Sequence, residues 1–491
     1  MRKIKILSGL GLTAFLLVCV VLFRTFSSSL APIAVKPVTI NVDTSHSAQH
    51  LAEAIRFKTI TFQDVQKINK DAFMSFHSYL KKTYPRVHAS LQLKTLGADD
   101  LSLLFTWEGR NKSLKPILLM AHQDVVPITK GTEENWLQPP FSGNIVDGYI
   151  WGRGTMDMKG GLIGIMEAVE ALLKEGFQPE RTIMLAFGHD EEGGGTAGAR
   201  EIANYLSAQN SHFEFVLDEG GFISKGIVPD VVEPAAMIGI SEKGIVSLRL
   251  TVEAEGGHSS MPGKHTSVGL LSKAITEIED NLFPVNLAYA ENFLGTISPK
   301  MPFIKRMIFS NLWLFSPLVK SQLEKSRSMN AMIRTTTAVT MISGSEKENI
   351  LPIKATAVVN FRILPGETIS SVLGYVKKTL AGFNVKVEIM PDLKANPSPI
   401  SSTQSQGYKI LTKSILQVAP EQPLVIPFLL VGASDSRYFT GISDNVYRFL
   451  YNHLGAKDLK RFHGTNERIE AKQYRETVMF YYQLIRNYQN I

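Results

Sequence analysis

Acidic side chains follow a predicted buried β-strand near the middle of this sequence. Glu191 and Glu192 come directly after Thr182–Phe187, an apolar run of strand-like composition, and a glycine-rich loop follows them. Two adjacent carboxylates repel each other unless a cation or a shared proton offsets their charge. An isolated pair of this kind is most often a solvated acidic loop, so its meaning depends on the rest of the chain.

Two further predicted strands end in the same way. His122 and Asp124 follow the strand Lys115–Met120, and Asp218 follows the strand Phe213–Leu217. In an open α/β sheet, ligands bind in the crevice outside the carboxyl ends of the strands. We therefore expect these side chains to meet in one crevice.

Asp157 and His463 complete the set of residues that could bind a metal. Asp157 lies just before an amphipathic helical stretch that ends at Gly176, where an aspartate could also serve only as a helix N-cap. One histidine is too few for two zinc ions, and His463, before the helical stretch 471–488, is the best second candidate. Oxygen ligands mixed with imidazole suit zinc or another divalent first-row ion.

These motifs resemble, in order and spacing, those of the co-catalytic zinc peptidases. The matching residues are His122-x-Asp124, the segment 152–161 around Asp157, the Glu191–Glu192 pair, Asp218 and His463. That family includes carboxypeptidase S, aminoacylase and succinyl-diaminopimelate desuccinylase. The resemblance covers most of the chain after the N-terminal segment. It is greatest to carboxypeptidase S and to the secreted synthase/hydrolase of N-fatty-acyl amino acids.

The resemblance implies two Zn²⁺ ions per subunit, with cobalt or manganese as alternative metals. The implied ligands are His122, Asp157, Glu192, Asp218 and His463, and Asp157 would bridge both ions. Asp124 would orient the imidazole of His122, and Glu191 would act as the general base. A cis peptide bond between Asp157 and Met158 is also implied.

The implied fold is an α/β catalytic domain with a mixed sheet, interrupted by an inserted α+β lid that also serves dimerisation. We expect an N-terminal signal segment at 1–30, a first catalytic segment at 43–237, the lid at 238–363 and a second catalytic segment at 364–491. The predicted strand–helix–strand–strand order of the inserted part also fits an α+β sandwich by pattern alone.

Several residues outside the metal set are candidates for handling the substrate. The resemblance implies that His258, in a turn of the lid, stabilises the oxyanion of the tetrahedral intermediate. Asn349, Arg362 and Arg437 are candidates for holding a substrate carboxylate, a task that suits arginine. The segment 281–319 is rich in aromatic and aliphatic residues. It is either the core of an enlarged lid or an apolar surface for an acyl chain or a membrane.

The N-terminus predicts export from the cytoplasm. Arg2, Lys3 and Lys5 precede a mostly apolar run, Ile6–Phe23, which we interpret as an uncleaved signal anchor, with a cleaved signal peptide and secretion as the alternative. The net charge of +7 is dispersed along the chain rather than gathered in a basic run, so nucleic acid is not an expected partner.

Together these features predict a zinc-dependent hydrolase of amide bonds in small peptides or N-acyl amino acids that have a free carboxylate. Within the same fold, the alternative is an N-fatty-acyl amino acid hydrolase/synthase. An alternative of another class is a catalytically silent binding protein, against which the intact set of metal-binding residues with Glu191 argues. A transporter is excluded because there is only one apolar span.

Overall fold

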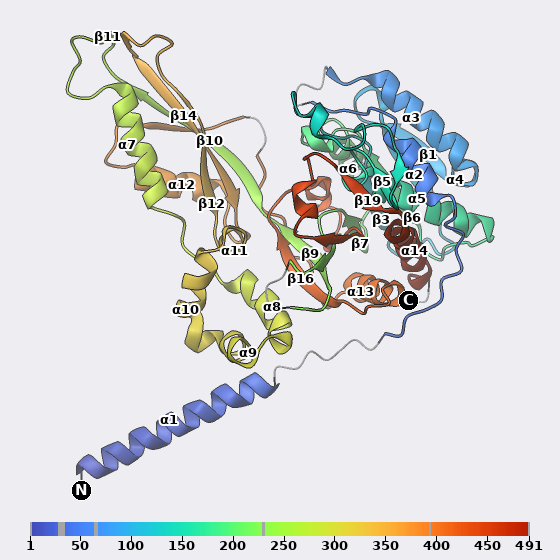
Figure 1. Ribbon diagram of the computed structural model, residues 1–491, viewed down its shortest axis with the longest axis horizontal. Coiled ribbons are helices and arrows are strands. Elements are labelled where there is room, and N and C mark those ends of the chain that lie inside the picture. Colours follow the sequence, from blue (N-terminus) through green and yellow to red (C-terminus); the bar gives the residue numbers. More distant parts are fainter. Residues whose placement is uncertain (1, 28–34, 63–66, 228–230, 392–393, 490–491) are drawn as a thin grey trace. The chain divides into compact units, whose positions relative to one another are not determined.

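The computed structural model describes residues 2–27, 35–62, 67–227, 231–391 and 394–489 (Figure 1). The chain forms two compact units. The larger unit comprises Leu30–Ile240, Ile400–Phe428 and Ser434–Ile491, and the smaller comprises Met1–Ser29, Ser241–Pro399 and Leu429–Ala433. The smaller unit is thus inserted into the chain of the larger one.

A mixed sheet forms the centre of the larger unit. Its strand order is β1-β2-β6-β3-β7-β17-β9-β8-β18, and β16 pairs with β9. The strands are β1 (Gln92–Leu96), β2 (Ser102–Trp107), β3 (Ile117–His122), β6 (Ile183–Gly188), β7 (Phe215–Asp218), β8 (Ile223–Lys225), β9 (Ala235–Glu242), β16 (Leu424–Leu430), β17 (Val446–Arg448) and β18 (His453–Gly455). The central strands β6, β3, β7 and β17 run parallel, whereas β1 and β2 are antiparallel additions.

Helices cover both faces of this sheet. Alternate side chains of a strand point to opposite faces, and in β3 both sets are buried. Ile117 and Leu119 pack with the helices α2 (Ser47–Ile55), α5 (Lys159–Lys174), α13 (Gln406–Val418) and α14 (Ala471–Asn487). Leu118 and Met120 pack with α6 (Ala199–Ala208). This two-sided burial explains why the sequence of β3 is a continuous apolar run. A three-stranded sheet of β19 (Arg468–Glu470), β5 (Tyr149–Trp151) and β4 (Ile145–Val146) completes the unit.

The smaller unit has a four-stranded antiparallel sheet in the order β12-β14-β10-β15. These strands are β12 (Thr336–Ser343), β14 (Lys354–Ile363), β10 (Gly244–Glu253) and β15 (Lys386–Ile389). Buried and less buried residues alternate along β14, as expected for a sheet covered on one face, and α7 (Ser267–Asp280) and α12 (Ile369–Thr379) supply that cover. A two-stranded pair, β11 (Gly257–His258) with β13 (Ile350–Leu351), also belongs to this unit.

The end of the smaller unit differs from the expected division at residue 363. The unit continues to Pro399, because β15 pairs with β10 and α12 packs against the same sheet. Its central segment begins at Ser241, three residues after the division expected at residue 238. The observed fold is therefore a mixed α/β fold with an inserted α+β unit.

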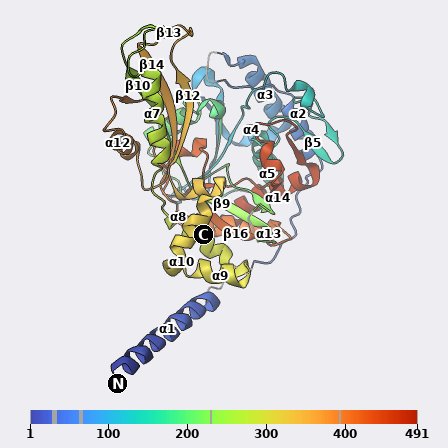
Figure 2. The same cartoon turned by 60° about the vertical axis from the view of Figure 1, so that its left-hand side comes forward.

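Additional helices of the smaller unit are α8 (Ala288–Ile297), α9 (Phe303–Ser310), α10 (Leu312–Glu324) and α11 (Arg327–Ile333). The N-terminal helix α1 (Arg2–Ser27) has its last turns beside α9 (Figure 2). Among the residues described by the structure, no helix has both the length and the apolar character needed to cross a membrane. The expected membrane-spanning anchor is therefore not supported.

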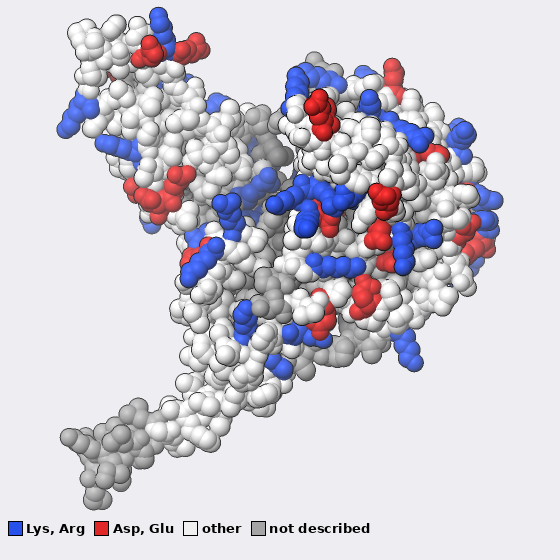
Figure 3. All heavy atoms as spheres, viewed as in Figure 1, with Lys and Arg blue, Asp and Glu red and all other residues white. Residues whose placement is uncertain are grey.

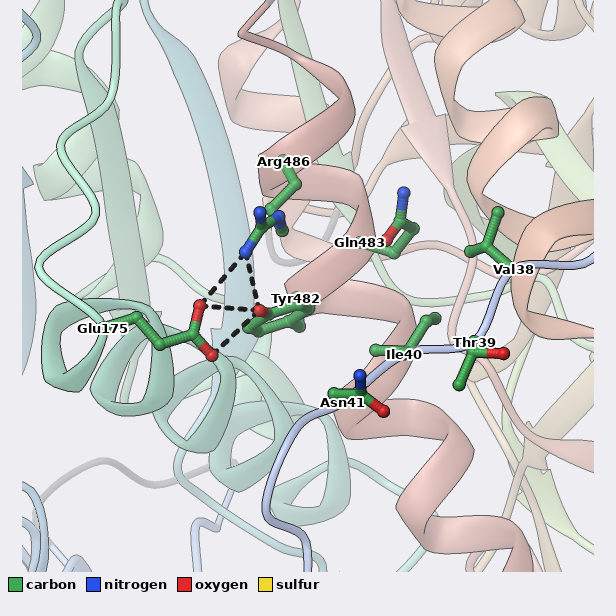
Figure 4. A pocket seen from close by; sticks show the side chains of 8 residues that line it. All are labelled: Val38, Thr39, Ile40, Asn41, Glu175, Tyr482, Gln483 and Arg486. Carbon is green, nitrogen blue, oxygen red and sulfur yellow. Dashed lines mark hydrogen bonds and ion pairs between the residues drawn. The ribbon is translucent and has the colours of Figure 1, made fainter.

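A polar cavity of about 410 Å³ lies on the larger unit between residues 38–41 and α14. The hydroxyl of Tyr482 donates to the carboxylate of Glu175, and the guanidinium of Arg486 donates to both (Figure 4). This network connects the end of α5 to α14. None of the predicted site residues lines the cavity.

Candidate metal-binding active site

Three strand ends meet at one edge of the large sheet. In the parallel register, His122 at the end of β3 lies opposite Gly188 at the end of β6, and Leu119 lies opposite Leu217 of β7. The loops that leave β3, β6 and β7 therefore start side by side. Crevices outside such strand ends are where open α/β sheets bind ligands.

His122 is the centre of a first group of metal-capable side chains. Its Nε2 lies 3.0 Å from Asp157 Oδ1 and 3.4 Å from Glu219 Oε1, and its side chain is only 1% exposed. Its Nδ1 lies 3.3 Å from Asp124 Oδ1. Burial by itself lowers the pKa of His122, but the carboxylates of Glu219, Asp124 and Asp157 outweigh it and hold that pKa well above its usual range.

His463 is the centre of a second group. Its Nε2 lies 3.1 Å from Asp157 Oδ2 and 3.2 Å from Glu192 Oε2. Hydrogen bonds to Asp157 and then to Glu192 raise the pKa of His463 to about 10. The backbone of His463 has a positive φ of 55°. Its side chain is half-exposed, so this group lies nearer to solvent than the group around His122.

Asp157 belongs to both groups. One carboxylate oxygen faces His122 and the other faces His463. The Asp157–Met158 peptide bond is cis, which confirms the prediction from sequence. Such a carboxylate, with one oxygen directed to each side, is suited to bridging two cations.

The glutamate pair is held in place by Asp124. One oxygen of this fully buried carboxylate accepts a hydrogen bond from the backbone N–H of Glu191, and the other accepts one from the backbone N–H of Glu192. Because Asp124 also contacts His122, it links a predicted metal ligand to the loop with the predicted base. The two glutamates lie in a short 3₁₀ turn, Glu191–Gly193, after β6.

The electrostatics of the site favour a bound cation. Burial raises the pKa of Glu191 and of Glu192, and burial together with the charge of Asp157 raises the pKa of Glu219 to about 8. Glu192 Oε1 is buried without a hydrogen-bond partner. A divalent ion would offset this crowding of negative charge and satisfy the orphaned oxygen.

Three sets of possible ligand atoms, each within 4.8 Å of one another, occur among the described residues. They are His122–Asp157–Glu219, His122–Glu191–Glu192 and Asp157–Glu192–His463. Imidazole nitrogens combined with carboxylate oxygens suit zinc and similar divalent ions, so the residues present fit the implied metals.

Asp218 and Glu219 differ in their surroundings. The carboxylate of Asp218 accepts a hydrogen bond from the backbone N–H of Ser436, and Asp218 belongs to none of the three ligand sets. Glu219, the next residue, faces His122 instead. Sequence analysis named Asp218 as a metal ligand and did not name Glu219, although both stand at the same strand end.

A second residue that sequence analysis missed is Glu467. Its carboxylate is fully buried, and Oε1 accepts hydrogen bonds from the backbone N–H groups of Gly154, Met156 and Asp157. Its Oε2 accepts a hydrogen bond of 2.7 Å from Arg153. The only signal in the sequence was its place four residues after His463.

The four substrate-handling candidates are divided between the units. In the larger unit, Arg437 donates a 2.7 Å hydrogen bond to the carbonyl of Gly194, in the loop that follows the glutamate pair. In the smaller unit, the exposed His258 lies beside Asn349, whose carbonyl accepts a hydrogen bond from Ser259. Arg362 lies in a different sheet of that unit, on β14.

The chain is similar to known proteins over most of its length. A family model described as "Peptidase family M20/M25/M40" matches residues 118–487. The chain is 39% identical over 444 residues to "Probable carboxypeptidase S-like 2" of Dictyostelium discoideum, covering 90% of this chain and 84% of that protein. It is 38% identical over 439 residues to the N-fatty-acyl-amino acid synthase/hydrolase of Homo sapiens, covering 89% of this chain and 86% of that protein.

Among solved structures, the fold resembles that of an M20 family metallo-carboxypeptidase from Sulfolobus solfataricus. The TM-score is 0.67 at 19% sequence identity, and the match covers 91% of this chain and 99% of the other. This likeness shows a shared fold across both units of the chain.

Proposed function

Because the chain belongs to peptidase family M20/M25/M40, whose members are metal-dependent hydrolases, we propose that it is a dizinc enzyme that cleaves amide bonds in small peptides or N-acyl amino acids. The observation that supports this most directly is the carboxylate of Asp157, whose two oxygens face separate groups of ligands.

In this proposal, His122, Asp157 and Glu219 would hold one ion, and Asp157, Glu192 and His463 would hold the other. Glu219 thus takes the place that the sequence assigned to Asp218. Zinc is the favoured metal for this donor set, with cobalt or manganese as substitutes. When bound, the ions would polarise the scissile carbonyl and lower the pKa of the attacking water.

Glu191 is the proposed general base. It is placed among the ligands by the hydrogen bond from its backbone to Asp124. Glu191 accepts a proton from the attacking water as the water oxygen bonds to the carbonyl carbon. It then passes this proton to the amine nitrogen as the C–N bond breaks, so that the products are a free amine and a carboxylic acid, whose proton is then lost to water or to the amine.

Three residues of the smaller unit are also proposed to handle the substrate. His258 would donate a hydrogen bond to the oxyanion, and Asn349 and Arg362 would hold the free carboxylate of the substrate. Arg437 was a further candidate for that carboxylate. Its bond to the carbonyl of Gly194 favours a role in holding the glutamate loop instead.

Two substrate classes follow from the names of the relatives. A carboxypeptidase S-like enzyme would cleave a small peptide, whereas an N-fatty-acyl-amino acid synthase/hydrolase acts on fatty-acyl amino acids in both directions. A panel of dipeptides and of N-acyl amino acids with short and long acyl chains, with zinc added, would decide between them. Condensation of a fatty acid with an amino acid would test the synthetic direction.

Glu191→Gln is the matched control for this panel, because it removes the proposed base and keeps the side chain's size. Turnover of one substrate class by the wild type and its loss in Glu191→Gln are expected. Binding of every panel member without turnover, with both metals present, would instead indicate a silent binding protein and would refute the hydrolase proposal.

The site of action and the assembly are further parts of the proposal. Basic residues before the N-terminal apolar run favour export, followed by secretion or by retention at a membrane surface. A homodimer through the smaller unit is also proposed. Fractionation of the producing cells would test the site of action. Light scattering of the purified chain would test the homodimer.

A further inference from the structure

Helices α9 and α10 expose large apolar side chains that the hydrolase proposal does not use. We define the α9–α10 surface by Phe303, Ile304, Trp313, Leu314 and Leu318. Ile304 is 66% exposed and Trp313 is 51% exposed, and the other three are also classed as exposed. Side chains of the neighbouring α8, including Phe293, Leu294 and Ile297, are buried, whereas α9 has no buried residue and α10 buries only Val319 and Leu323. Large exposed apolar patches mark sites of interaction with a protein or a membrane.

The N-terminal helix α1 extends this surface. The buried side chain of Asn311 donates to the carbonyl of Val21 and to the hydroxyl of Thr25, at 3.2 Å each. Arg306 Nε donates to the carbonyl of Thr25 at 2.9 Å, and the rings of Phe26 and Phe303 are 5.9 Å apart. These contacts hold one narrow face of the end of α1 against α9 and against Asn311, the residue between α9 and α10 (Figure 2).

The rest of α1 is apolar and exposed. Among the residues from 11 to 27, the exposed large side chains are Leu12, Phe15, Leu16, Leu17, Val18, Val20, Leu22, Phe23 and Phe26. A helix that is apolar on every side is stable only where an apolar medium covers it. The contact with α9 and α10 covers only Val21 and Thr25.

The charges on these segments have one sign. Between Asn292 and Leu323 there are four basic residues, Lys300, Lys305, Arg306 and Lys320, and no Asp or Glu. Residues 2–27 likewise contain four basic residues, Arg2, Lys3, Lys5 and Arg24, and no acidic one. On the face shown in Figure 3, red spheres are absent from the visible part of α1 and from the area of α9 next to it.

We propose that α9 and α10, together with the exposed side of α1, form a surface that lies in the interface of a phospholipid membrane with anionic headgroups. Exposed apolar side chains, a tryptophan among them, on segments whose only charged residues are lysines and arginines are features of helices that lie in such an interface. A second copy of the chain is a less suitable occupant, because a symmetric contact would set these like charges against each other. The inference does not depend on the hydrolase proposal.

The test uses the full chain made by cell-free translation and floated with vesicles of phosphatidylcholine, with or without phosphatidylserine. We expect flotation to increase with phosphatidylserine, since each basic residue near an anionic surface strengthens binding by roughly fivefold. Ile304→Glu should weaken partitioning at least about tenfold. The matched control is Ile353→Glu, because Ile353 is 68% exposed in the same unit but away from α9 and α10, and it should bind like the wild type.

A second measurement reports contact directly. Brominated phosphatidylserine should quench part of the tryptophan fluorescence, and Trp313→Phe should remove that part. If the quenching is unchanged in Trp313→Phe, or if Ile304→Glu binds as tightly as Ile353→Glu, the α9–α10 surface does not face lipid and the proposal is wrong. Dimerisation that Ile304→Glu abolishes, without vesicle binding by the wild type, would overturn it in favour of self-association.

Discussion

The carboxylate of Glu467 accepts a hydrogen bond from the backbone N–H of Asp157, across 310 residues of sequence. His463, four residues earlier, faces the side chain of the same aspartate. The short segment from His463 to Glu467 therefore contacts both the backbone N–H and the side-chain carboxylate of Asp157. Glu467 also pairs with Arg153, so that a buried ion pair fixes the loop before Asp157.

The variant Glu467→Gln tests whether Glu467 holds the loop before Asp157 in place. The variant retains one acceptor oxygen for the loop, but it places an amide N–H₂ against the guanidinium of Arg153. That guanidinium keeps its hydrogen bond to the carbonyl of Gly464 but loses its buried counter-charge. We expect a loss of about 3 kcal/mol in the free energy of unfolding, in the range seen when a buried ion pair loses one member. Zinc content of the purified variant should also fall, because the Asp157 loop is no longer fixed.

Urea denaturation and elemental analysis would measure the two effects of Glu467→Gln. The control is Glu180→Gln, because Glu180 pairs with Arg110 on the surface, where such pairs contribute at most about 1 kcal/mol. Equal stability losses in the two variants would contradict the supporting role of Glu467.

The sequence predicted where the site lies but not every residue in it. Apolar runs followed by acidic residues or histidine identified the ends of β3, β6 and β7, because a strand buried on both faces has a recognisable composition. Neighbouring residues at a strand end point in opposite directions, however, so the choice between Asp218 and Glu219 requires the orientation of the strand. The role of Glu467 depends on a contact distant in sequence, which local patterns do not reveal.

The same reasoning explains the domain boundaries. The switch from parallel α/β pattern to alternating strands near residue 238 is a local signal, and the observed division at Ser241 is close to it. The far boundary was expected at 363, after the last strand of the predicted strand–helix–strand–strand order. Only the pairing of β15 with β10 assigns residues up to Pro399 to the smaller unit.

Substitutions of Asp218 and of Glu219 should have opposite effects on metal binding. We expect Glu219→Gln to lower the zinc content, because this side chain faces His122 and Asp157. Asp218→Asn should retain its metal, because an amide oxygen can still accept the hydrogen bond from Ser436. Elemental analysis after dialysis would distinguish them, and loss of zinc from Asp218→Asn alone would restore the assignment made from sequence.

His50 gives a prediction for the pH dependence of stability. The hydrogen bond to Glu167 raises the pKa of His50 above its usual value, so the folded state holds this proton more tightly than the unfolded state. The resulting stabilisation is complete below the ordinary histidine pKa of about 6.5 and is lost as the pH rises through the folded-state value.

The variant His50→Gln removes this contribution. The difference in unfolding free energy between wild type and His50→Gln should be larger at about pH 6 than at about pH 9. Urea denaturation at the two pH values would measure it, with the exposed His212→Gln as the control. A difference that grows toward high pH would show that the protonated imidazole is not the stabilising form.

Substitutions of Glu191 and Glu192 should distinguish the general base from the metal ligand. Glu191→Gln keeps the size of the side chain but cannot accept a proton from water. General base catalysis contributes about 10²–10⁴-fold, so we expect a rate loss of at least that order with zinc content unchanged. Glu192→Gln removes a charged ligand that faces His463, so it should lower zinc occupancy, and excess zinc should restore part of the activity. The two variants should therefore differ more in metal content than in rate.

Loss of zinc from Glu191→Gln with retention of zinc in Glu192→Gln would reverse the two roles. Full activity of Glu191→Gln would exclude it as the base, whatever the metal content.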